Sequence, residues 1–76
     1  MSTPSVTQDT AAKVRARAAA LRIPTSTLAD MTGIPYKALL RRVRGEVEFT
    51  IGELITVAYA LSVQPTELMP DQEVAA

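Results

Sequence analysis

Glycine and proline divide this chain into short segments, each of which has the residue pattern of a helix. Pro24 ends the first segment, because a proline pushes the residue before it out of the helical conformation. Gly33 ends the second segment and Gly45 the third, since glycine readily adopts the left-handed conformation that follows many helices. Pro35 suits the start of the third segment, where its missing N–H breaks no hydrogen bond. The sequence therefore predicts an all-α fold, a compact domain of five short helices without strands.

The first expected helix begins at Asp9 or Thr10, in a run of alanines that favours helix. Residues 1–8 are rich in Ser, Thr and Pro, and we expect a flexible N-terminal arm there. The ordered domain is expected to span residues 9–70, followed by a C-terminal tail at 71–76. The apolar stripe of the first helix is narrow and consists of Val14, Ala18 and Leu21.

The fourth segment has the clearest local signal in the chain. Thr50 and Glu53 are spaced as in a capping box, and Phe49 and Leu54 are spaced as in a hydrophobic staple. A short fifth helix follows, with Pro65 in its first turn. We expect the fourth helix to form the core of the domain through Ile51, Leu54, Ile55, Ala58 and Leu61.

The composition excludes several classes of function. The 76 residues include no Cys and no His, which removes disulfides, thiolate metal sites and the commonest general base. No paired carboxylates suggest catalysis, so we expect neither an enzyme nor a cofactor, metal or small-molecule ligand. No apolar run approaches the roughly 18 residues of a membrane span. The N-terminus also lacks a secretory signal, so we expect a cytoplasmic protein without a membrane partner.

The net charge of zero hides a strong asymmetry. Residues 11–45 hold all eight basic side chains and one acidic residue, whereas residues 46–76 hold six acidic residues and no base. In the third segment, Lys37, Arg41 and Arg44 share one outward stripe if Leu39 and Val43 point inward. This pattern indicates an electropositive face that meets an anion, although a bipolar surface that only keeps the protein soluble is the alternative.

The second and third segments are joined by the turn TGIP, at about residues 32–35, as in a helix-turn-helix. Leu28–Ala29, Gly33–Ile34, Gly45 and the stretch FTIGELITVAYALSVQPTELM occur in the order typical of one family. In these residues the sequence resembles the lambda Cro/repressor-type helix-turn-helix domain, over about residues 11–69. Within this family, the stretch LLRRVRGE at residues 39–46 is most similar to that of small regulators of actinobacteria and their phages.

The resemblance implies a sequence-specific regulator of transcription, Cro-like or a minimal repressor, that binds double-stranded operator DNA. Its recognition helix, at about residues 35–44, would lie in the major groove. Tyr36, Lys37 and Arg41 would read bases, and Arg41 can donate two hydrogen bonds to a guanine. The expected phosphate contacts are Thr25, Ser26, Arg42 and Arg44.

Other interpretations of these residues stay open at this point. Tyr36 can instead be a half-buried packing residue, and Arg42 can pair with Glu46 or Asp30. Thr25 or Ser26 can also cap the second helix. The cations of the first helix can form an ordinary solvated face, with one of them touching the DNA backbone; they are Lys13, Arg15, Arg17 and Arg22.

Glu46 and Glu48 follow the third helix, so the loop that contains them is expected to stay away from phosphates. Val47 and Phe49 in the same loop can instead contact a second copy, and we expect a weak homodimer in a bacterial or phage-infected cell. The alternative function is a protein-interaction module, such as an antitoxin or anti-regulator, that keeps the fold without binding an operator.

Overall fold

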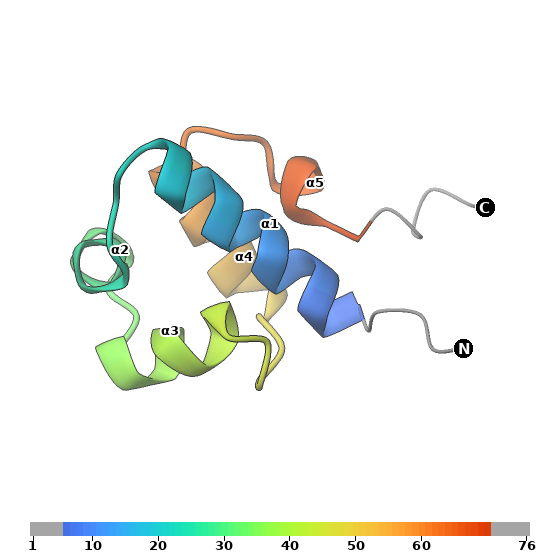
Figure 1. Ribbon diagram of the computed structural model, residues 1–76, viewed down its shortest axis with the longest axis horizontal. Coiled ribbons are helices and arrows are strands. Elements are labelled where there is room, and N and C mark those ends of the chain that lie inside the picture. Colours follow the sequence, from blue (N-terminus) through green and yellow to red (C-terminus); the bar gives the residue numbers. More distant parts are fainter. Residues whose placement is uncertain (1–5, 71–76) are drawn as a thin grey trace.

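Five helices joined by short turns make up most of residues 6–70, the part of the chain that the computed structural model describes (Figure 1). No strand occurs in this part, and the all-α prediction is confirmed. The third helix lies along one edge of the molecule, with α1 crossing in front of α4 (Figure 1). The helices are α1 at Val6–Ala20, α2 at Thr25–Thr32, α3 at Tyr36–Val43, α4 at Ile51–Ala60 and α5 at Pro65–Leu68.

Two expected helix starts are wrong. α1 begins at Val6 rather than at Asp9 or Thr10, because nothing between Val6 and Gln8 breaks a helix and the Gln8 amide donates to the carbonyl of Gly45. The rest of the expected arm and the expected tail at 71–76 lie outside the described residues. α2 has no side-chain cap from Thr25 or Ser26, since Pro24 occupies the N-cap position and its carbonyl accepts the first helical hydrogen bond.

The glycine and capping signals at the other helix ends are confirmed. Gly33 follows α2 in the left-handed conformation, with φ of 78°, which a residue with a Cβ rarely adopts. At the start of α4, the Glu53 backbone N–H donates to Oγ1 of Thr50 at 3.1 Å, and the Thr50 N–H donates to Oε1 of Glu53 at 2.9 Å. The capping box thus fixes the point at which α4 leaves the loop after α3.

The core face of α4 is rotated from the expected one. Leu54, Ala58 and Leu61 are buried as predicted, but Val57 is also fully buried, whereas Ile51 and Ile55 are 67% and 51% exposed. The apolar residues of α4 cover more than half of its circumference, so the sequence alone allows two faces. Packing against α2 on one side and α5 on the other selects the face that contains Val57.

Three cations of α1 hold the C-terminal ends of three other helices. Lys13 Nζ donates to the carbonyl of Met69 at 2.7 Å, Arg15 Nη1 to that of Val43 at 2.6 Å, and Arg17 Nε to that of Leu61 at 3.1 Å. These carbonyls close α5, α3 and α4, where helical acceptors lack partners and the helix dipole is negative. The solvated face expected for these residues is therefore wrong for all three.

Replacing one of these cations should destabilise the fold. We expect Arg17→Met to lower the free energy of unfolding by about 1–2 kcal/mol, because the Leu61 carbonyl loses a charged donor. Urea denaturation measures the change. The matched control is Arg22→Met, since the Arg22 side chain is exposed and has no hydrogen bond or ion pair within the described part of the chain. Equal losses for the two variants would contradict the capping role of Arg17.

Candidate nucleic-acid interface

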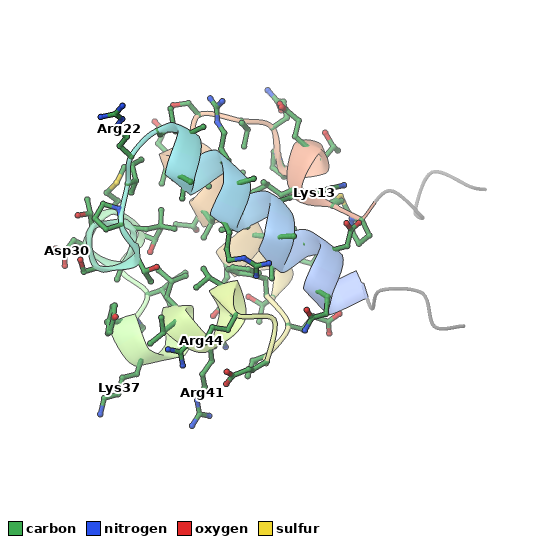
Figure 2. The ribbon with its side chains drawn as sticks, in the orientation of Figure 1. Lys13, Arg22, Asp30, Lys37, Arg41 and Arg44 are labelled. Carbon is green, nitrogen blue, oxygen red and sulfur yellow. The ribbon has the colours of Figure 1, made fainter. Side chains whose placement is uncertain are left out.

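The recognition-helix candidate α3 buries one side and presents cations on the other. Leu39 and Val43 are buried in the core, which fixes the rotation of α3 about its axis. Lys37, Arg41 and Arg44 are all exposed, as predicted. Figure 2 shows the Lys37 and Arg41 side chains extending away from the body of the protein. The helix thus presents a positively charged edge to the solvent.

The exposed cations of this edge are available to an external anion. Neither the Lys37 nor the Arg41 side chain has a hydrogen bond or ion pair with any residue that the structure describes. Arg44 Nη1 lies 4.0 Å from Oε2 of Glu46, and the two side chains are 59% and 55% exposed. A pair that long and that exposed contributes little, so a phosphate could replace Glu46 at small cost.

Arg42 is engaged within the protein. Its Nε donates to Oε1 of Glu53 at 2.7 Å and its Nη1 to the carbonyl of Ala38 at 3.1 Å. The partners expected from the sequence, Glu46 and Asp30, are wrong, because the side of α3 that carries Arg42 faces the first turn of α4. The ion pair therefore joins α3 to the capping box of α4.

The pKa of Glu53 reflects this position. Partial burial acts to raise it, but hydrogen bonds from the Thr50 backbone and from Arg42, together with the positive charge of Arg42, outweigh burial and leave the pKa below its usual value. The ionised carboxylate is therefore the form that the fold stabilises. Glu53 thus both caps the start of α4 and joins α3 to it through Arg42.

α2 and the start of α3 together form a shallow hollow beside the cationic edge. Ser26, Asp30 and Tyr36 all line it. Tyr36 is 48% exposed, so it packs with part of its ring and offers the rest to the solvent. Thr25 is half-buried in the first turn of α2. The structure thus brings two predicted contacts, Ser26 and Tyr36, to one place.

Asp30 is a residue of this surface that the sequence reasoning did not place there. It is exposed on α2, on the same side as Ser26. Its helical spacing of four from Ser26 was the available signal. A carboxylate at this rim repels phosphate, so a DNA backbone is expected to pass on the Ser26 side of it.

Val47 and Phe49, the residues expected to contact a second copy, lie in different surroundings. Val47 lies beside the cationic edge, in a hollow that Lys37, Ala38 and Arg41 also line. Phe49 is half-buried and packs against the core. Phe49 is thus partly engaged within the single chain, and the expected contact of both residues with a second copy stays a prediction.

Among residues 6–70, no group of three or more acidic side chains lies together as a metal site would require. No helix in that part has the length and apolar character needed to cross a membrane.

Comparisons with known proteins agree with this geometry. A sequence model of the Cro/C1-type HTH DNA-binding domain matches residues 13–73. No curated protein matches the sequence. The crystal structure of the restriction-modification controller protein C.AhdI from Aeromonas hydrophila has a similar fold, with a TM-score of 0.79 and 22% identity; the similarity covers 83% of this chain and 96% of that one.

The fold and the exposed cations of α3 define a helix-turn-helix DNA-binding protein. Because the family model spans most of the chain, the protein belongs to the Cro/C1-type HTH DNA-binding domain family. It is a DNA-binding regulator of transcription, as the resemblance implied. The roles of individual residues stay predictions.

The ion pair between α3 and α4 predicts a pH dependence of stability. The pKa of Glu53 is lower in the folded state than the ordinary glutamate value of 4.5, so the unfolded chain binds more protons in acid. The stabilisation by ionised Glu53 is complete above that value and is lost as the pH falls through the folded pKa. Urea unfolding of the wild type and of Glu53→Gln, at neutral pH and well below 4.5, measures this contribution.

Glu53→Gln should be less stable than the wild type at neutral pH, and the difference should shrink in acid. Thr50 can still be capped by the glutamine carbonyl, so the variant removes the charge and keeps the shape. A difference that stays constant with pH would show that the Glu53 charge does not stabilise the fold.

Proposed function

We propose that the protein binds double-stranded operator DNA with α3 in the major groove and acts as a Cro-like or minimal repressor. The observation that carries this proposal is the division of its cations. Four of the eight basic side chains donate to the protein's own acceptors: Lys13, Arg15, Arg17 and Arg42. Lys37 and Arg41, by contrast, share one exposed edge and have no partner in the described part of the chain. Binding a polyanion gives these two a partner.

The outward-facing residues of α3 would contact the bases. Arg41 can donate two parallel hydrogen bonds to O6 and N7 of a guanine, and Lys37 can reach the same acceptors. Tyr36, at the first turn of α3, has half of its surface free for contact with a base or a sugar. These three residues would set the preferred sequence.

Phosphate contacts would flank the recognition helix. Arg44 is exposed after the end of α3. Thr25 and Ser26 stand at the start of α2, where no side chain caps the helix and the backbone N–H groups can bind an anion. Arg42 has only its second terminal nitrogen left for phosphate, since the other two nitrogens are engaged. Among the cations of α1, Arg15 is held at the end of α3 and is the one we expect to approach the backbone.

Two copies would act together on one operator. A single small module contacts few base pairs, and repressors of this architecture commonly bind two half-sites as dimers. Val47 and Phe49 can supply part of a dimer contact, but both are half-buried in their own chain. The cytoplasm of a bacterial or phage-infected cell is the place where such a regulator would act.

Substitutions on the cationic edge test the proposal. On a site selected from random DNA, Arg41→Ala should cost about 1–3 kcal/mol and relax the preference at one base pair. Arg44→Ala should weaken binding to all sequences alike and lower the salt dependence. Gel shifts at two or more salt concentrations measure both effects.

Arg22→Ala is the control, because Figure 2 places Arg22 at the opposite edge of the molecule from Lys37 and Arg41. It removes the same charge and should change binding little. Identical sequence profiles for Arg41→Ala and Arg44→Ala would refute the division into base and phosphate contacts. A wild type that binds no DNA in a salt-dependent way would favour the protein-interaction module instead.

A further inference from the structure

Asp30 is the single acidic residue among residues 11–45, a stretch that also holds all eight basic side chains of the protein. Its side chain nevertheless has no hydrogen bond or ion pair with any residue that the structure describes. Asp30 is exposed, and Figure 2 shows its side chain extending outward from α2. One carboxylate in a basic stretch is therefore free to act on whatever approaches from the solvent.

The stability of α2 does not explain a carboxylate at this position. Asp30 lies in the last turn of α2, which ends at Thr32, and the helix dipole is negative there, so an acidic residue is unfavourable. Aspartate is also among the weaker helix formers. Since no internal contact of the side chain offsets these two costs, a role at the surface is the better explanation for Asp30.

The hollow beside α3 places Asp30 next to the proposed DNA contacts. Asp30 lines this hollow together with Ser26, a proposed phosphate contact, and Tyr36, a proposed base contact. It is also the one charged residue among those that line the hollow; the others are Ser26, Ala29, Gly33, Ile34, Pro35 and Tyr36. The hollow is thus negative, whereas the neighbouring edge of α3 is positive.

We propose that Asp30 is a specificity-determining residue, which repels the DNA backbone from the hollow and weakens binding to non-operator DNA more than binding to the operator. This step rests on the proposed function, because it requires α3 to bind DNA. The group that Asp30 acts on is a phosphate in the wrong position, and no base contact is assigned to it.

Repulsion by Asp30 discriminates because the two kinds of complex hold the backbone differently. On the operator, hydrogen bonds from Arg41 and Lys37 to base edges fix the protein on the duplex, and the backbone runs past Ser26. On other sequences no base contact fixes the protein, which slides along the duplex through its attraction to phosphates. Phosphates then pass over the hollow, where the carboxylate opposes them. A repulsive group thus acts mainly on the wrong complex.

The exposed cations of α3 make this repulsion useful. Lys37, Arg41 and Arg44 attract any polyanion, whatever its sequence. Non-operator sites far outnumber operators in a genome, so the ratio of the two affinities decides how much protein reaches the operator. Asp30 improves this ratio without removing a cation that the operator complex needs.

Asp30→Asn tests this role, because it keeps the size of the side chain and removes its charge. The variant should bind random-sequence DNA about three- to tenfold more tightly than the wild type. Its affinity for a selected operator should change by less than about twofold, because the phosphates of that complex avoid the hollow. Fluorescence anisotropy with both duplexes, at several salt concentrations, measures the two affinities. Asp30→Glu keeps the charge and should retain the wild-type ratio.

Ala19→Lys is the control with the same change in net charge. Ala19 is exposed in the last turn of α1, and its carbonyl accepts from the Arg22 N–H at 3.0 Å. It therefore lies with Arg22 at the edge opposite Lys37 and Arg41 (Figure 2). This variant should leave the ratio of the two affinities unchanged. Urea denaturation should show Asp30→Asn to be at least as stable as the wild type, which excludes a folding defect.

The outcomes separate this inference from the proposed function. Equal gains of Asp30→Asn on operator and random DNA, or no gain on either, would overturn the role of Asp30 and leave operator binding by α3 intact. A loss of operator affinity alone would also overturn it, because Asp30 would then contact a base. A wild type that binds no DNA would overturn the proposed function, and the role of Asp30 with it.

Discussion

Burial of Leu39 and Val43 is the constraint on which the rest of the surface depends. These two side chains fix the rotation of α3 against the core, and that rotation decides that Lys37 and Arg41 face the solvent. Contacts at the end of α3 keep it there: Arg15 holds its last carbonyl, and Arg42 joins it to Glu53 on α4. The exposure of these cations on α3 therefore depends on the packing of the helices behind it.

The basic side chains in the first half of the sequence have two separate roles in the structure. Part of the positive charge of the first half stabilises helix ends, through the lysine and two arginines of α1 that reach the carbonyls of three other helices. Another part is exposed on and after α3 and has no strong internal partner. The side chains of the first group are engaged within the protein and those of the second face the solvent, although the total charge of the segment does not distinguish the two.

Local signals in the sequence predicted most of the fold. The helix count, the turn at Gly33, the capping box at Thr50 and Glu53, and the outward direction of Lys37 and Arg41 all follow from patterns within a few residues. What could not be predicted depends on contacts between distant segments. Arg17 reaches the carbonyl of Leu61 only because α1 crosses the end of α4. The exposed face of α4 was missed because its apolar residues fit two rotations equally well.

The most direct test of the account is an NMR titration that follows the side-chain N–H groups of the arginines and lysines as selected DNA is added. The account predicts that Arg41 and Lys37 shift strongly, and that Arg17 and Lys13 keep the signals of groups bonded to protein carbonyls. Shifts concentrated on α1, with Arg41 and Lys37 unchanged, would contradict the claim that α3 is the helix that meets DNA.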